Sequence, residues 1–174
     1  MSGHIRRARH DERDRITEIR FAVQENRLGN PALVTAEDYA WFTEHPGIWV
    51  WEEDGQVQGF AAGDPRDGTI WALFVDPCCE GRGIGRALFG AACDTLRRAG
   101  HRTAMLTTDP GTRAERFYRT AGWKVVGNST RDELIFGRFS EVLDHAPSAS
   151  STIRLSSTCA PAARSAASVC SLTL

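Results

Sequence analysis

Residues 75–89 read VDPCCEGRGIGRALF, and the rest of the chain is best interpreted outward from this stretch. An apolar run at 70–75 precedes it, three glycines alternate with other residues, and an amphipathic helix then begins. The first N–H groups of a helix have no acceptors inside the helix, and the helix dipole adds partial positive charge there. Glycines let the backbone approach a phosphate closely, because no Cβ intervenes. The order strand, glycine loop, helix therefore predicts an anion site, which we interpret as a site for pyrophosphate.

The chain has 174 residues, enough for one domain of ordinary size with a real core. We divide it into a folded domain at 1–145 and a C-terminal tail at 146–174. Serine and alanine dominate this tail, which contains no acidic residue. Because it lacks periodic bulky apolar residues, we expect it to be disordered rather than to add a packed layer.

Charge, hydropathy and cysteine usage argue against several classes of partner. The formal net charge of -1 gives no case for a nucleic-acid partner, and no hydrophobic run is long enough to cross a bilayer. The 5 cysteines have no Cys-x-x-Cys spacing, and the 5 histidines are scattered, so no metal site and no disulfide framework is predicted. No apolar targeting segment follows Met1, so we expect a cytoplasmic protein without a membrane partner.

The hydrophobic pattern predicts a sheet covered by helices. Strand-like runs at 48–52, 57–63 and 69–75 form an antiparallel meander, whose first turn contains Asp54-Gly55, a strong hairpin signal. The other expected elements are strands at 4–9, 103–108, 123–127 and 134–139, and helices at 11–26, from 35 to about 46, at 85–99 and just before 122. This order predicts an α+β (mixed α/β) fold with a central, mostly antiparallel sheet of six to seven strands and helices on both faces.

Two other phosphate-binding loops fit the glycine stretch poorly. The loop of nucleoside triphosphatases needs Gly-Lys-Ser/Thr, whereas Lys124 is the only lysine of the chain. The dinucleotide fingerprint needs Gly-x-Gly-x-x-Gly in a βαβ unit, whereas Gly81, Gly83 and Gly85 alternate after an antiparallel meander. A plain turn would not need three glycines that lead directly into a helix.

Two motifs carry a family resemblance. Val75-Asp76-Pro77 followed by Glu80-Gly81-Arg82-Gly83-Ile84-Gly85 matches Arg/Gln-x-x-Gly-x-Gly/Ala at a strand-to-helix junction after Val-x-Pro. Residues 114–123, AERFYRTAGW, match a short helix with a tyrosine before a Gly-aromatic pair. With these motifs at this separation, the chain resembles the GNAT superfamily of acyl-CoA N-acyltransferases over about residues 4–139.

The resemblance implies a GNAT-like fold and an enzyme that moves the acetyl group of acetyl-CoA to an amine by direct attack. It implies that the backbone of Leu73, Phe74 and Val75 pairs with pantetheine where strands 69–75 and 103–108 diverge, and that an N–H there polarises the thioester carbonyl. The pyrophosphate would be bound by backbone amides of Gly81, Arg82, Gly83, Ile84, Gly85 and Arg86.

Tyr118 is the general acid that the resemblance implies for the leaving CoA thiolate. A phenol with an ordinary pKa of about 10 is protonated at neutral pH and can donate. Without the motif, Tyr118 would be interpreted as a half-buried aromatic residue that packs beside Phe117.

The chain departs from the family pattern at two positions. Glu80 stands where arginine or glutamine is usual, so its side chain is not expected to bind phosphate. Gly111 stands in place of a frequent asparagine that contacts pantetheine, and Thr112 is a candidate substitute for that contact.

The general base cannot be identified from the sequence. Family members often carry a glutamate on a central strand, but residues 69–75 contain no acid. Glu25, Glu52 and Asp109 are candidates, and each can equally be a solvated surface charge. Trp49 and Trp51 share one face of a strand, where they could wall an acceptor pocket or pack in the core.

Two other functions stay open. One is a non-catalytic acyl-CoA-binding or regulatory domain, which the absent strand glutamate and Glu80 favour. The other is an interaction module of the same fold without a CoA site. For the enzyme, the expected acceptor is a small-molecule amine or a protein amino group, and a homodimer would be common in this family.

Overall fold

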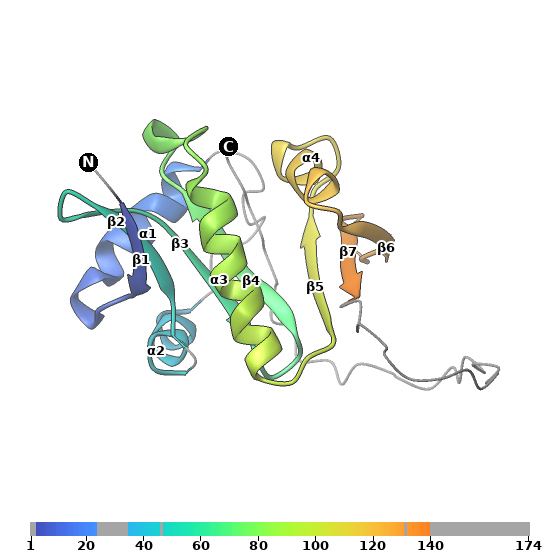
Figure 1. Cartoon of the computed structure of the whole chain (residues 1–174), viewed down its shortest axis with the longest axis horizontal. Coiled ribbons are helices and arrows are strands. Elements are labelled where there is room, and N and C mark those ends of the chain that lie inside the picture. Colours follow the sequence, from blue (N-terminus) through green and yellow to red (C-terminus); the bar gives the residue numbers. More distant parts are fainter. Residues whose placement is uncertain (1–2, 24–34, 46, 131, 140–174) are drawn as a thin grey trace, which may run out of the picture.

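The computed structural model describes residues 3–23, 35–45, 47–130 and 132–139. They form one seven-stranded sheet flanked by helices (Figure 1). The strands are β1 (His4–Arg7), β2 (Trp49–Glu53), β3 (Gln56–Asp64), β4 (Thr69–Val75), β5 (Thr103–Thr108), β6 (Lys124–Asn128) and β7 (Leu134–Phe139). The helices are α1 (Arg13–Ala22), α2 (Ala36–Glu44), α3 (Ile84–Arg98) and α4 (Arg113–Thr120), with the 3₁₀ turns η1 (His10–Glu12) and η3 (Pro77–Cys79).

The strand order is β1-β2-β3-β4-β5-β7-β6. Neighbouring strands are antiparallel except for β4 and β5, which are parallel. The expected α+β fold with a mostly antiparallel sheet is therefore confirmed, and the sheet has seven strands. The bounds expected for β4, β5 and β7 agree with the structure to the residue.

The first helix is shorter than the sequence pattern predicts. A 3₁₀ turn precedes α1, and Val23 leaves the helical region with a ψ of 124°. Residues 24–26, which the expected helix included, lie outside the described residues. The tail at 146–174 also lies outside them.

Two apolar cores fill the two faces of the sheet. The α3 and α4 face is built around Leu73, Leu88, Leu106, Tyr118 and Phe136. The α1 and α2 face is built around Ile16, Ile19, Tyr39, Phe42, Val50, Phe60, Trp71 and Phe74. Side-chain alternation along β4 explains the division, because Leu73 and Val75 point to one face and Phe74 to the other.

β4 and β5 are joined at one end only. Thr69 pairs with Met105, and the Met105 N–H donates to the Gly68 carbonyl at 3.1 Å. Toward their carboxyl ends the two strands separate, as Figure 1 shows, and the described ladder contains no other pair between them. In the described part of the chain, the core on the α1 and α2 face includes no residue from β5, β6 or β7. The sheet is therefore open between β4 and β5 at the end that carries the glycine loop.

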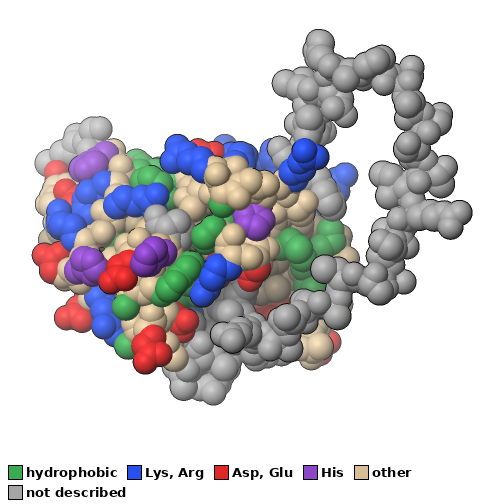
Figure 2. Space-filling view, turned by 90° about the horizontal axis from the view of Figure 1, so that it is seen from below, with side chains coloured by type: hydrophobic (Ala, Val, Ile, Leu, Met, Phe, Trp, Pro, Cys, Tyr) green, Lys and Arg blue, Asp and Glu red, His purple; other side chains and the backbone are tan. Residues whose placement is uncertain are grey.

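The glycine loop and α4 lie at the same end of the sheet (Figure 1). Figure 2 shows the opposite end, where basic and acidic side chains are intermixed with histidines. Among the helices that the structure describes, none combines the length and the apolar character needed to cross a membrane.

Candidate active site

The glycine loop adopts the backbone conformation that its sequence requires. Gly81 and Gly83 have φ angles of 72° and 81°, in the left-handed region that favours glycine. Gly83 is the N-cap of α3 and offers no side chain to the helix terminus. A Cβ placed on either glycine would meet no protein atom within 4 Å. The N-terminal amides of α3 therefore open onto space that a ligand can occupy.

Asp76 fixes the start of the loop. Its carboxylate accepts hydrogen bonds from the Cys78 N–H at 3.1 Å and from Arg15 Nη2 at 2.5 Å. Partial burial acts to raise the pKa of Asp76, but these hydrogen bonds outweigh it, and the pKa lies below its ordinary value. Asp76 and Cys79 in turn raise the pKa of the Cys78 thiol to about 12, so this exposed cysteine is a thiol at neutral pH. Cys78 is therefore not poised as a thiolate nucleophile.

A cavity of about 530 Å³ lies between the loop and α4. The described residues that line it include three arginines, one of which, Arg113, forms an ion pair with Glu80; the lining consists of Gly81, Gly83, Arg86, Arg113, Arg116, Phe117 and Thr120. Arg113 and Arg116 share a face of α4 because they are three residues apart. The cavity thus combines a helix N-terminus with three guanidinium groups, a combination that suits a ligand with several phosphates.

Leu73–Val75 form the carboxyl end of β4, which leads into the glycine loop. On one side these residues pair with β3, through Leu73 to Ala61 and Val75 to Gly59. On the other side β4 and β5 have already separated, so this segment is not part of their ladder. The side chains of Leu73, Phe74 and Val75 are buried, which leaves their backbone as the part of the segment that can meet a ligand.

Tyr118 is completely buried in the core beneath the cavity. Its ring lies 5.5 Å from the ring of Phe89 and 5.7 Å from that of Phe136, measured between centroids. Phe117, the residue before it, contributes to the cavity wall, whereas Tyr118 does not. Tyr118 shares its core with Leu73 and Val75, so the structure brings it to the α3 and α4 side of the open β4 edge.

Comparison with known proteins agrees with this geometry. The family model described as the acetyltransferase (GNAT) family matches residues 9–123. The chain belongs to the GNAT family. A mycothiol acetyltransferase of Sanguibacter keddieii is 33% identical over 126 residues, which are 67% of this chain and 36% of that protein. This chain therefore spans about a third of the length of that relative.

Two other similar proteins cover more of their own length. The peptidyl-lysine N-acetyltransferase YjaB of Salmonella typhimurium is 33% identical over 144 residues, 77% of this chain and 92% of that protein. A solved structure of yncA from Salmonella typhimurium with its cofactor acetyl-CoA superposes with a TM-score of 0.59. It shares 23% identity and covers 86% of this chain and 100% of its own, so it supports the fold alone.

The departure from the GNAT pattern at Glu80 has a structural partner. The Glu80 carboxylate accepts a hydrogen bond from Arg113 Nη1 at 2.7 Å, and the two side chains form an ion pair between the loop and α4. A sequence comparison of the loop alone does not reveal this pair. The i, i+3 spacing of Arg113 and Arg116 was the signal that could have indicated a cationic face on α4.

The side chains of Arg82 and Ile84 do not reach the cavity. Arg82 Nη2 contacts the Glu53 carboxylate at 2.5 Å, and Nη1 donates to Gln58 Oε1 at 3.2 Å. The arginine lowers the pKa of Glu53 below its ordinary value. The Ile84 side chain is buried in the core. Any contact of these two residues with a phosphate must therefore use the backbone N–H.

Thr112 and Gly111 serve the start of α4. The Thr112 hydroxyl accepts a hydrogen bond from the Glu115 N–H at 3.1 Å and donates to the Asp109 carbonyl at 2.8 Å. Gly111 has a φ of 78°, and its N–H donates to the Glu115 carboxylate at 2.7 Å. The Thr112 hydroxyl is thus occupied by helix capping, which leaves little capacity for the asparagine contact it was expected to replace.

The candidate general bases are not gathered at the open edge. Glu52 accepts hydrogen bonds from Arg6, which holds the pKa of this carboxyl below its ordinary value, so Glu52 is a weak base. Asp109 is exposed in the turn before α4, and Glu25 lies outside the described residues. Searched for metal ligands, the described residues contain no group of three or more His, Cys, Asp or Glu side chains that could hold an ion.

The tryptophans do not form one acceptor wall. Trp49 and Trp51 pack against the α3 core, and Trp49 Nε1 donates to the Thr95 hydroxyl of α3 at 2.8 Å. Trp71 lies on the opposite face, stacked on Phe42 with ring centroids 4.0 Å apart. Core packing is therefore the role of the Trp49 and Trp51 pair.

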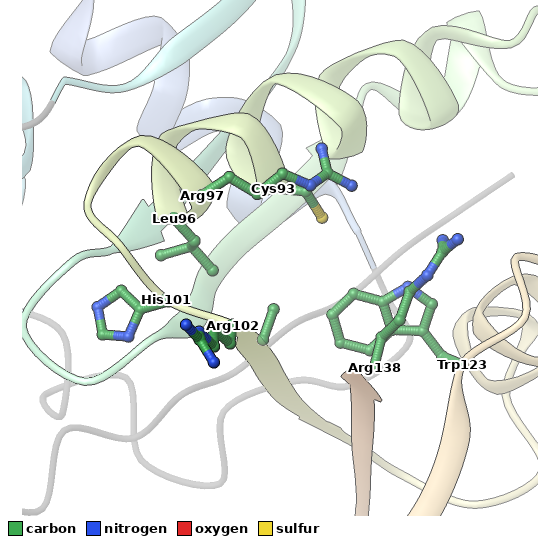
Figure 3. Close-up of a pocket in the computed structure, with 8 residues that line it drawn as sticks. Cys93, Leu96, Arg97, His101, Arg102, Trp123 and Arg138 are labelled. Carbon is green, nitrogen blue, oxygen red and sulfur yellow. The ribbon is translucent and has the colours of Figure 1, made fainter. Parts of the chain in front are cut away.

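A second cavity, of about 40 Å³, lies beside the C-terminal end of α3 (Figure 3). Cys93, Leu96, Arg97, His101, Arg102, Ala104, Trp123 and Arg138 line it. In Figure 3 the guanidinium of Arg102 points away from those of Arg97 and Arg138, so the three cations do not converge on one point. This cavity shares no lining residue with the one at the glycine loop.

Proposed function

We propose that this GNAT-family chain is an acetyl-CoA-dependent N-acetyltransferase. The observation that carries the proposal is the cavity between the glycine loop and α4, which joins the uncapped N-terminus of α3 to three arginines. Such a site suits the pyrophosphate of CoA. The backbone edge of Leu73–Val75 that faces away from β3, which is outside the described ladder with β5, suits the amides of pantetheine, which can pair with a strand edge.

The proposed reaction is a direct transfer. The lone pair of the acceptor amine attacks the thioester carbonyl carbon, a C–N bond forms, and the C–S bond breaks as the CoA thiolate leaves. A backbone N–H of Leu73–Val75 stabilises the oxyanion that forms on the carbonyl oxygen. The amine loses a proton to solvent or to a water chain, since neither β4 nor β5 carries a carboxylate.

Tyr118 is the proposed general acid for the departing thiolate. Its burial in the core cluster that also includes Leu73 and Val75 supports this role. A protonated phenol at that place can give its proton to the thiolate without water. The position of Tyr118 behind Phe117, away from the cavity wall, implies that it does not bind the phosphates.

The names of the relatives indicate a chemical class for the acceptor of this chain. The related proteins are named for mycothiol and for peptidyl-lysine, a small molecule and a protein amino group. We propose that the acceptor of this chain is also an amine, either on a small molecule or on a protein.

The deciding experiment measures CoA binding and acetyl transfer separately. Calorimetry with CoA is expected to give saturable binding, and acetyl-CoA turnover is expected with at least one amine of a broad panel. Absence of CoA binding would contradict the proposal and favour an interaction module.

A non-catalytic acyl-CoA-binding domain is the second candidate. The ion-paired state of Glu52 and the absence of acids on β4 favour it, because neither leaves an evident base near the thioester. CoA binding without turnover on any amine would select this candidate over the enzyme.

A further inference from the structure

Arg20 on α1 is a buried cation that has no counter-charge among the residues that the structure describes. Its exposed fraction is 8%, and among the described residues it is the only buried cationic side chain. Nη1 donates to the Tyr39 hydroxyl at 3.3 Å, whereas Nη2 has no hydrogen-bond partner. No carboxylate of the described residues forms an ion pair with this guanidinium, unlike those of Arg6, Arg15, Arg66, Arg82 and Arg113.

Such an arrangement is costly for the folded protein. A buried charge is normally paired, and a buried N–H donor normally has an acceptor. The rings of Phe74 and Trp71 lie 5.1 Å and 6.0 Å from the guanidinium carbon of Arg20, which gives favourable cation–π contact. These rings supply no lone pair for Nη2, so they leave its hydrogen-bonding capacity unmet.

Arg20 lies on the face of the sheet opposite the cavity proposed for CoA. Phe74 lies between Leu73 and Val75 on β4, with its side chain on the α1 and α2 face. The cavity proposed for CoA is lined by the loop, α3 and α4, on the other face of the sheet. A thioester in the opening between β4 and β5 would therefore meet its acceptor from the α1 and α2 face, where Arg20 contacts Phe74.

We propose that Arg20 binds a carboxylate of the acceptor, so that the substrate is an amine that also carries a carboxylate, such as a free amino acid. The inference rests on the proposed acetyltransferase function. A single guanidinium with an unused Nη2 matches the single charge and the two oxygens of a carboxylate. Because Nη2 is enclosed, binding requires rotation of the Arg20 side chain or of the Tyr39 ring, and such rotamer changes are common at binding sites.

The test compares each acceptor with its own carboxamide. An amino acid and its amide share the same amine and side chain and differ in the charged carboxylate. The full chain is assayed with acetyl-CoA at saturation, and rates are corrected for the neutral fraction of each amine. We expect kcat/KM for the acids to exceed that for the amides by about tenfold or more.

Arg20→Met removes the cation while it keeps a long apolar side chain. We expect it to abolish the preference for acids, through a rise in KM for acids of about tenfold or more, and to change the amides by less than about threefold. Arg13→Met, on the exposed face of the same helix, is the matched control and should keep the preference. CoA affinity should be unchanged in both variants.

The outcomes separate this inference from the proposed function. Equal rates for acids and amides in the unmodified chain, or a preference that survives in Arg20→Met, would overturn the inference while the acetyltransferase function stands. Failure of the unmodified chain to bind CoA would overturn the proposed function instead. If Arg20→Met does not fold, Arg20→Gln replaces it, because it also removes the cation: a loss of acid preference without a loss of amide turnover supports the inference, and a retained acid preference overturns it.

Discussion

Glu80 and Arg113 connect the two walls of the large cavity across 33 positions of the sequence, with Glu80 Oε2 2.7 Å from Arg113 Nη1. Glu80 lies in the loop before α3, and Arg113 is the first residue of α4. Arg113 thus brings a cation from α4 to the loop position at which arginine or glutamine is usual in the family. The carboxylate of Glu80 holds it there.

Arg113→Ala is expected to weaken CoA binding about tenfold or more, because it removes a charge-assisted contact and leaves Glu80 unpaired near phosphates. Glu80→Gln is expected to change affinity by about threefold or less, since Arg113 is retained. The double variant should bind better than Arg113→Ala alone. Titration calorimetry measures all three, with Arg119→Ala on the exposed face of α4 as the control. An Arg113→Ala variant with unaltered affinity would remove this residue from the phosphate site.

Gly83→Ala and Gly90→Ala are expected to have opposite effects on stability. At Gly83 the φ of 81° makes any other residue strained by about 1 kcal/mol, and the new methyl group faces the ligand space. At Gly90, in the exposed middle of α3, alanine should raise stability by roughly 0.5–1 kcal/mol. CoA affinity should fall in Gly83→Ala and stay constant in Gly90→Ala. Denaturant unfolding measures the stability of both variants, and calorimetry measures their CoA affinity. A larger loss of CoA affinity from Glu80→Gln than from Gly83→Ala would contradict phosphate binding by the backbone amides of the loop.

Tyr118→Phe is expected to lower kcat by about 100-fold, the usual scale for loss of a general acid, with CoA affinity unchanged. The ring stays packed among Phe89 and Phe136, so the change in stability should be about 1 kcal/mol or less. Single-turnover rates of acetyl transfer, compared with CoA affinity from calorimetry, give the sharper readout, because they separate a loss in the chemical step from a loss in binding. An unchanged kcat would exclude Tyr118 as the acid.

Glu12 makes stability depend on pH. Its carboxylate accepts hydrogen bonds from Arg6 Nη1 at 2.8 Å and from the Arg9 N–H at 2.7 Å, and Arg6 holds the pKa below its ordinary value of 4.5. A carboxyl group whose pKa is lower in the folded state stabilises the fold when the pH is above the pKa of the group in the unfolded state. This stabilisation is lost as the pH falls through the pKa of the group in the folded state. Glu12→Gln should therefore cost roughly 1 kcal/mol at neutral pH and progressively less below about pH 4.5. Urea unfolding at several pH values measures the difference, and a cost that does not shrink in acid would argue against this origin.

The local signals in the sequence were enough for the framework of the fold. The apolar run at 70–75, the Asp54-Gly55 turn and the alternating glycines each act through neighbours in the chain, and each lies where its pattern predicted. The ion pair between Glu80 and Arg113 could not be read in this way, because it depends on how α4 docks against the loop. Long-range packing, not propensity, decides such contacts.

The aromatic residues show the same limit. Alternation correctly placed Trp49 and Trp51 on one face, but it could not tell which face meets α3. The burial of Arg20 was equally hidden, since a single arginine in an amphipathic helix normally reaches solvent. It results from the packing of α1, α2 and β4 around the side chain, which brings together residues far apart in the sequence.

The single pair that joins β4 to β5 has a consequence for how the molecule holds together. Among the described residues, Thr69 and Met105 form the one ladder pair between the four N-terminal strands, β1–β4, and the three C-terminal strands, β5–β7. A CoA molecule that pairs with the free edge of β4 would connect the N-terminal and C-terminal strands. The co-substrate would then complete the sheet of the enzyme at the gap between β4 and β5. We would then expect amide hydrogen exchange in β5 and β7 to slow when CoA is added, because the two halves would open together rather than separately.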